Sequence, residues 1–157
     1  KLHAPLATAK QLQLIRKSRG VLPAKVTGDG FRISQILSNL ISNAIKFTSA
    51  GAVYIDTEAF KLDDKRLSFQ VLVRDTGIGI ESEKLPSLFN EFSQADVNTH
   101  KQFGGTGLGL AISKQLMSRM QGEIGFQSEQ DKGSEFYLLL PLASTWPSAS
   151  TTWGLPP

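Results

Sequence analysis

Residues 104–110 read Gly-Gly-Thr-Gly-Leu-Gly-Leu and run directly into an apolar helical pattern. Four glycines in six residues are costly to order, because glycine loses more backbone freedom on folding than any other residue. Such a stretch indicates that something approaches the backbone closely. At a helix start the free N–H groups and the partial positive charge favour an anion, so this pattern predicts a phosphate ligand. Taken alone, the same pattern is also typical of plain turns.

Three polar residues, Asn39, Asn43 and Lys46, recur on one face of a predicted helix. Spacings of four and three residues place them one above another, opposite much of the apolar stripe of that helix. Asparagine is a poor residue for a helix interior, because its side chain competes for backbone hydrogen bonds. An amide oxygen is a hard, neutral ligand suited to Mg²⁺, and a lysine one turn away supplies a point charge for phosphate. The alternative interpretation is a solvated polar face.

A carboxylate and two glycines, Asp75, Gly77 and Gly79, follow an apolar strand pattern. A carboxylate at a strand end accepts a hydrogen bond from an exocyclic amino group such as that of adenine. The glycines would let a ring pass close to the backbone. These residues therefore predict an adenine site, and the alternative is an Asp-Thr-Gly turn that closes the strand.

A long polar segment, residues 93–105, leads up to the glycine-rich motif without any sustained periodicity. Phe89 and Phe92 lie three apart on a predicted short helix and would anchor one end of this segment. Lys101 stands four residues before Gly105. A loop of this length inside a compact domain is usually a lid or a binding loop, or else it is disordered.

The composition sets limits on the function. The 157 residues are enough for one domain with a real core, and 40% apolar with 20% charged residues is typical of a globular protein. A net charge of +3 with scattered basic residues argues against a nucleic-acid partner. The absence of cysteine excludes disulfides and thiolate metal sites. No apolar run approaches the roughly 20 residues of a membrane span, so we expect no direct membrane contact.

Hydrophobic periodicity predicts how these motifs are positioned. Helices are predicted over residues 31–47, with Asp29 as N-cap, over 83–92 and over 106–120, and the first ten residues resemble the end of a further helix. In the last of these helices Leu108, Ile112, Leu116 and Met120 are predicted to share the buried face. Five strands are predicted over residues 11–16, 52–60, 67–74, 122–128 and 134–140.

Hairpin-spaced strands alternating with helices predict the α+β class. We expect a two-layer α/β sandwich with a mixed, largely antiparallel five-stranded sheet and three main helices on one face. We interpret residues 1–142 as this domain. Residues 143–157 are uncharged and rich in Ser, Thr and Pro, so they predict a flexible C-terminal tail or linker.

The order of the motifs resembles the catalytic and ATP-binding domain of sensor histidine kinases, in the group that includes the gyrase, Hsp90 and MutL ATPases. The resemblance covers about residues 10–142 and implies a Bergerat-type ATP-binding fold. Its motifs are the N box at 39–48, the G1 box at 75–80, the F box at 88–94, the G2 box at 104–110 and the closing motif at 133–136.

The resemblance implies ATP and Mg²⁺ as ligands, with Asn43 holding the metal and Asn43, Lys46 and Lys101 as catalytic residues. It makes residues 93–104 an ATP lid. Many relatives have arginine where Lys101 stands, and lysine lacks the bidentate fork of arginine. The implied nucleotide contacts are Asn39, Asn43, Lys46, Phe47, Asp75, Gly77, Gly79, Ile80, Lys101, Gly105, Thr106, Gly107, Leu108, Gly109 and Ser134.

The family's phosphoacceptor is a histidine on a dimerising helix pair, and neither His3 nor His100 fits that pattern. The implied partners are therefore a separate dimerisation domain that carries the acceptor histidine, and the receiver domain of a response regulator. The implied location is the cytoplasmic part of a membrane-anchored sensor.

Two other functions remain open at this stage. A hydrolase of the gyrase or MutL kind uses a glutamate one turn before the metal-binding asparagine. That position is Asn39 here, which cannot take a proton from water. A nucleotide-binding regulatory module without catalysis is the second alternative.

Overall fold

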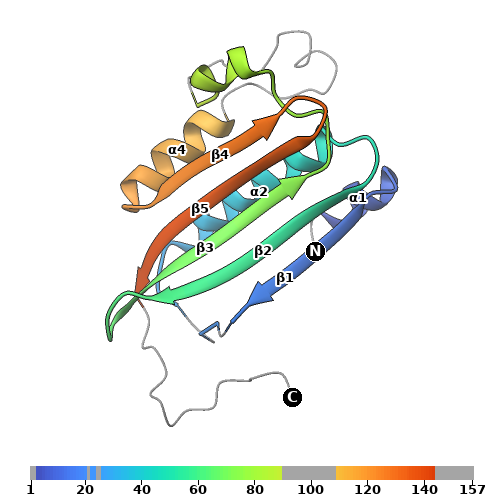
Figure 1. Ribbon diagram of the computed structural model, residues 1–157. Coiled ribbons are helices and arrows are strands. Elements are labelled where there is room, and N and C mark those ends of the chain that lie inside the picture. Colours follow the sequence, from blue (N-terminus) through green and yellow to red (C-terminus); the bar gives the residue numbers. More distant parts are fainter. Residues whose placement is uncertain (1–2, 21, 24–25, 90–108, 144–157) are drawn as a thin grey trace.

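The computed structural model describes residues 3–20, 22–23, 26–89 and 109–143. Its centre is one five-stranded sheet in the order β1-β2-β3-β5-β4, with α2 and α4 on one face (Figure 1). The strands are β1 (Gln13–Arg19), β2 (Ala52–Lys61), β3 (Arg66–Asp75), β4 (Glu123–Glu129) and β5 (Gly133–Ala143). The helices are α1 (Ala4–Ala9), α2 (Gly30–Lys46), α4 (Gly109–Arg119) and the short 3₁₀ helix η1 (Ser82–Ser87).

The pairing of the strands confirms the predicted class. β1 pairs with β2 in parallel, whereas β2–β3, β3–β5 and β5–β4 are antiparallel. The sheet is thus mixed and largely antiparallel, in an α+β fold. Because β3 and β5 are neighbours, the end of β3 lies beside the start of β5, which joins segments some 60 residues apart in the chain.

Two glutamines end helices in a conformation usually left to glycine. Gln11 and Gln121 have φ of 58° and 59°, and each follows a helix. The N–H of Leu12 donates to the Ala7 carbonyl, and that of Gln11 to Thr8, which is the paired bonding of a Schellman motif. Gln121 closes α4 in the same way. The predicted strand over residues 11–16 therefore begins too early, because residue 11 belongs to the helix end.

Helix α2 follows its predicted pattern. The Asp29 side chain accepts a hydrogen bond from the Arg32 N–H at 3.1 Å, which confirms it as the N-cap. The apolar stripe packs on the sheet, with Ile36, Leu40, Ala44 and Ile45 buried. This packing leaves Asn39 facing α4 and Lys46 exposed at the end of the helix.

Helix α4 is rotated from its predicted orientation. Leu116 is buried and Met120 packs against the core, as predicted, but Ile112 is not buried, and Leu108 lies outside the described residues. Its buried residues are Ala111, Ser113, Leu116 and Met117, while Ile112 is 41% exposed. The contact with α2 sets this rotation, because Gly109 and Ser113 both meet Asn39 of α2. Small residues allow the two helices to approach there, and that turns Ile112 outward.

Of the predicted helix over residues 83–92, the structure describes the part up to residue 89, and there the helix ends at residue 87. Residues 82–87 form the 3₁₀ helix η1, which contains Pro86. Phe89 follows it and packs on Phe126 of β4, with ring centroids 5.3 Å apart. This contact attaches Phe89 to the sheet, whereas Phe92 and the predicted lid lie outside the described residues. No helix in the described part of the chain is long and apolar enough to cross a membrane.

Candidate nucleotide-binding site

Asp75 is the last residue of β3 and is only 6% exposed. Its Oδ1 accepts two backbone hydrogen bonds, from the N–H of Gly77 at 2.9 Å and from the N–H of Ser134 at 3.3 Å. Burial raises the pKa of the Asp75 carboxyl, and the two N–H donors partly offset that rise. Two donors from two segments bind the same oxygen, so the carboxyl group is held in one orientation.

The segment after Asp75, residues 75–80, is attached on one side to the end of α2. The Ile78 N–H donates to the Phe47 carbonyl at 3.2 Å. The same carbonyl lies so close to Gly77 that a Cβ there would collide with it and with the Thr48 Oγ1. Thr48 is fully buried and donates to the Ala44 carbonyl at 2.7 Å, so it cannot move aside.

The other side of this segment is attached to the turn between β4 and β5. The Asp131 N–H donates to the Ile78 carbonyl at 2.6 Å. Gly79 adopts φ of 68° and lies against the carbonyl of Glu129. Protein backbone therefore already requires both Gly77 and Gly79, which is a reason for these glycines beyond the room for a ring that the sequence suggests.

Ser134, for which the resemblance implies a place near the adenine, lies beside Asp75 in the structure. Its N–H donates to Asp75, and its hydroxyl lies 2.7 Å from that of Ser128. Ser128 also accepts from the Ile80 N–H at 2.9 Å and was not among the predicted site residues. The available signal was the two-residue alternation of β4, which puts Ser128 on the same face as Ile124 and Phe126.

The polar residues of α2 are used in different ways. The Asn39 amide donates to the Ser113 hydroxyl at 3.2 Å, and a Cβ on Gly109 would collide with that amide. Asn39 thus contacts the first residue of α4. Asn43 is half-buried one turn further along, and Lys46 is exposed at the helix end.

The C-terminus of α2 is stabilised by a lysine from another element. Lys10 donates through Nζ to the carbonyls of Ile45 and Lys46, at 2.7 and 3.0 Å. A cation at this position complements the helix dipole and satisfies two carbonyls that have no partner inside the helix. This contact fixes the helix end that carries Lys46 and Phe47.

The structure therefore brings the predicted residues together in two groups. Asp75, Gly77, Gly79, Ile80 and Ser134 meet around the end of β3, with Phe47 against them. Asn39 and Gly109 meet between α2 and α4. Lys101, Gly105, Thr106, Gly107 and Leu108 lie outside the described residues. Within the described ranges, no three His, Cys, Asp or Glu side chains gather as metal ligands.

Residues 28–144 match the protein family described as histidine kinase-, DNA gyrase B-, and HSP90-like ATPase. The chain belongs to this family. The match contains α2, the whole segment around Asp75 and the β4–β5 turn, so every contact described around the carboxylate lies inside it.

Similar members of the family are sensor kinases. The chain is 42% identical over 153 residues to the sensor histidine kinase GacS of Pseudomonas protegens, which covers 98% of the chain and 17% of GacS. It is 41% identical over 133 residues to the signal transduction histidine-protein kinase BarA of Escherichia coli, covering 85% of the chain and 14% of BarA. The chain thus spans less than a fifth of the length of these curated relatives.

Solved structures agree with the fold. Full-length ShkA, crystallised in complex with AMPPNP, superposes with a TM-score of 0.75 at 34% identity, covering 93% of the chain and 29% of ShkA. The catalytic domain of the histidine kinase ThkA superposes with a TM-score of 0.68 at 24% identity, covering 89% of the chain and 86% of that domain. The second likeness concerns the fold alone.

Proposed function

We propose that the chain binds Mg-ATP and is the catalytic half of a histidine kinase. In this function the γ-phosphoryl group passes to a histidine on a separate dimerisation domain, and from there to the receiver domain of a response regulator. The observation that carries the proposal is the buried, doubly hydrogen-bonded carboxylate of Asp75. Family membership and the AMPPNP complex of ShkA support ATP as the ligand.

Asp75 provides the recognition of adenine. Both of its backbone donors bind Oδ1, so Oδ2 is the oxygen left to accept the exocyclic amino group. A carboxylate oxygen can only accept a hydrogen bond. Adenine offers it an exocyclic amino group, which is a donor, whereas guanine and hypoxanthine carry a carbonyl oxygen at the same ring position. Because burial raises the pKa of Asp75, a hydrogen bond from the ligand to the ionised form also relieves the cost of burying that charge.

With adenine at Asp75, the phosphates would extend toward α2 and α4. Asn43 would hold Mg²⁺ through its amide oxygen, with the remaining ligands supplied by phosphate oxygens and water, as is usual for this ion. Lys46, Lys101 and the glycines of residues 105–109 would contact the phosphates. Phosphoryl transfer needs mainly positioning and neutralisation of charge, and these residues supply both. The acceptor imidazole is the nucleophile and comes from outside the chain.

Hydrolysis of ATP by water is disfavoured by the side chain of Asn39. An amide is no general base, and here it donates to the Ser113 hydroxyl in a helix-to-helix contact. Rapid ATP turnover by the isolated chain, abolished in Asn39→Ala, would restore this alternative. A regulatory module without catalysis predicts ATP binding with no transfer to any acceptor.

The test is transfer of labelled phosphate between separate domains. The chain is incubated with Mg²⁺, ATP labelled in its γ-phosphate, and the dimerisation domain of its parent protein. We expect label on the acceptor histidine, and loss of transfer by at least tenfold in Asn43→Ala. Gln35→Ala removes an exposed amide from the same helix and should leave transfer unchanged. Bound ATP without transfer to that acceptor would refute the kinase assignment.

The location follows from the same assignment. We propose that the chain is part of the cytoplasmic portion of a membrane-anchored sensor, as the resemblance to sensor histidine kinases implies. Fractionation of cells that express the parent protein tests this, with protease accessibility of the domain measured from each side of the membrane. Digestion from the outer side of intact cells would contradict it.

A further inference from the structure

The Ser128 hydroxyl lies where three segments meet. Ser128 is the second-to-last residue of β4 and pairs across the sheet with Ser134 of β5. Its Oγ accepts from the Ile80 N–H at 2.9 Å, donates to the Gly133 carbonyl at 3.1 Å, and lies 2.7 Å from the Ser134 Oγ. One small side chain therefore links the end of segment 75–80 to β4 and to the β4–β5 turn.

The hydrogen count fixes the direction of these bonds. A serine hydroxyl has one proton to donate and two lone pairs to accept with. Because Ser128 gives its proton to Gly133, the Ser134 hydroxyl must be the donor in the pair of serines. The Ser128 oxygen then accepts twice, from Ser134 and from Ile80, and its capacity is fully used. An alanine here would leave two donors and one carbonyl without their partner.

Each of these bonds leads to Asp75. Ser134 donates through its N–H to Asp75 Oδ1, so the bond that its hydroxyl donates to Ser128 holds the residue that orients the carboxylate. Ile80 ends the segment whose Gly77 N–H is the second donor to the same oxygen. Gly133 adopts φ of 116° against the Asp75 carbonyl, where a Cβ would collide.

We propose that Ser128 is a positioning residue for adenine recognition, which acts through Ser134 and Ile80 to hold Asp75 in the orientation that accepts an amino group. This inference rests on the proposed function, because it concerns how the nucleotide is read. The proposed role of Ser128 needs no contact between its side chain and the base. Its loss should therefore weaken discrimination between bases more than it weakens the binding of triphosphate.

The test compares ATP with inosine triphosphate, whose base carries an oxygen in place of the amino group. In Ser128→Ala we expect the Kd of Mg-ATP to rise about tenfold and that of inosine triphosphate to rise less, so that the preference for ATP falls. The ratio of the two constants is insensitive to the folded fraction, since both ligands titrate the same folded molecules. A merely structural role would lower the melting temperature and leave the ratio unchanged.

Two further variants and one ligand-free measurement complete the design. Ser128→Thr keeps the hydroxyl and should restore the preference for ATP. Ser68→Ala makes the same deletion at the other end of the sheet on β3 and should change neither Kd. In the absence of nucleotide, hydrogen exchange of the Ile80 amide should be faster in Ser128→Ala and near wild type in Ser128→Thr.

The outcomes separate the two proposals. If the wild type prefers ATP and Ser128→Ala keeps that preference, the role of Ser128 is wrong while the proposed function stands. The same holds if the Ile80 amide exchanges equally fast in both proteins. If the wild-type chain binds neither nucleotide, the proposed function fails, and the role of Ser128 fails with it.

Discussion

Two carboxylates on neighbouring strands, Asp75 of β3 and Asp56 of β2, are both largely buried and differ in what holds them. Asp75 ends its strand and accepts two backbone N–H groups. Asp56 lies in mid-strand, and its side chain is 15% exposed. Its ion-pair partner is Arg19, at 3.5 Å, whose own side chain is 65% exposed. The first carboxylate is fixed by the fold, and the second by a long side chain in solvent.

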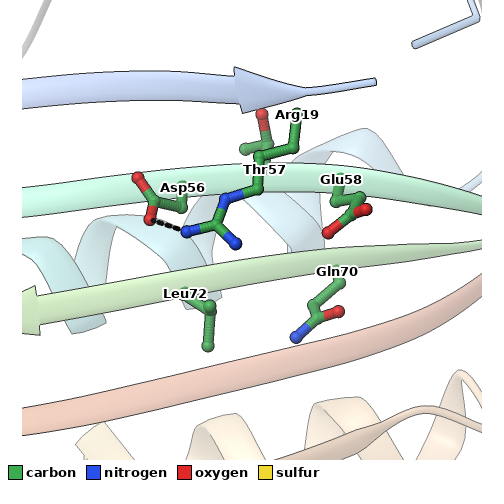
Figure 2. A pocket seen from close by; sticks show the side chains of 6 residues that line it. All are labelled: Arg19, Asp56, Thr57, Glu58, Gln70 and Leu72. Atoms are coloured by element: carbon green, nitrogen blue, oxygen red, sulfur yellow. Dashed lines mark ion pairs between the residues drawn. The ribbon is translucent and has the colours of Figure 1, made fainter. Parts of the chain in front are cut away.

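Figure 2 shows the surroundings of Asp56. The Arg19 guanidinium lies across β2, over a shallow hollow on the sheet face opposite α2 and α4. The residues lining it are Arg19, Asp56, Thr57, Glu58, Gln70 and Leu72. The buried Oδ1 of Asp56 has no hydrogen-bond partner among the described residues. Burial of a carboxylate therefore does not by itself make a recognition site. What distinguishes Asp75 is that two backbone N–H groups, one from the adjacent Gly77 and one from the remote Ser134, both donate to its Oδ1.

The largest expected effect breaks the recognition at Asp75 without changing its shape. In Asp75→Asn the amide oxygen would take the place of Oδ1, so the NH₂ group would face the amino group of adenine, donor against donor. We expect the Kd of Mg-ATP to rise on the order of a hundredfold, measured by calorimetry. Asp56→Asn makes the same change on the sheet face opposite α2 and α4, called the open face below, and should leave the Kd of Mg-ATP within about twofold of the wild-type value. Equal losses in the two variants would contradict the comparison.

The second prediction concerns the backbone that surrounds Asp75. In Gly77→Ala the new Cβ collides with the Phe47 carbonyl and with the buried Thr48, so segment 75–80 must shift. We expect a loss of about 2 kcal/mol in the free energy of unfolding, measured by urea denaturation. A Cβ at Gly30 meets nothing within 4 Å, so Gly30→Ala at the start of α2 should be neutral or slightly stabilising. An unchanged stability in Gly77→Ala would show that this backbone yields easily.

The sequence motifs named the residues that the structure brings together around Asp75, and their contact with a nucleotide stays a prediction. Motif spacing works here because β3 and β5 are adjacent, which places Ser134 beside the carboxylate. It could not single out Ser128, because one serine before a turn carries no distinctive spacing, and only the register of β4 on β5 gives it a role. The sequence also could not show why Gly77 and Gly79 must be glycine, because the atoms that a Cβ would meet there belong to remote segments.

Helix rotation and helix ends were the weaker predictions of the fold. The periodicity of α4 placed Ile112 inside, whereas the contact of Gly109 and Ser113 with Asn39 turns it outward. Hydrophobic periodicity follows the large apolar residues, so it misses the small residues that let two helices approach each other. Likewise Gln11 takes a position where glycine is the usual signal, so the boundary between α1 and β1 was misplaced.

The third prediction uses the pH dependence of stability. The pKa of Asp75 is raised in the folded state, so the stability linked to its proton is fully present below its unfolded pKa. That contribution is lost as the pH rises through the folded pKa. The free energy of unfolding of the wild type minus that of Asp75→Asn should therefore fall across this acid range and then level off. Denaturation in urea at a series of pH values measures it, and a difference that rises with pH would reverse the sign of the argument.

The smallest effect is expected at the ion pair of the open face. Arg19 is mostly exposed, and exposed pairs contribute little because solvent and salt screen them. We expect Arg19→Met to change the free energy of unfolding by less than about 0.5 kcal/mol and to leave the Kd of Mg-ATP unaltered. A larger loss that grows at low salt would mean that Arg19 offsets the cost of burying the Asp56 carboxylate, whose Oδ1 has no hydrogen-bond partner among the described residues. Arg19 would then fix Asp56 as firmly as the two backbone N–H groups fix Asp75, and the backbone donors would no longer be the difference between the two carboxylates.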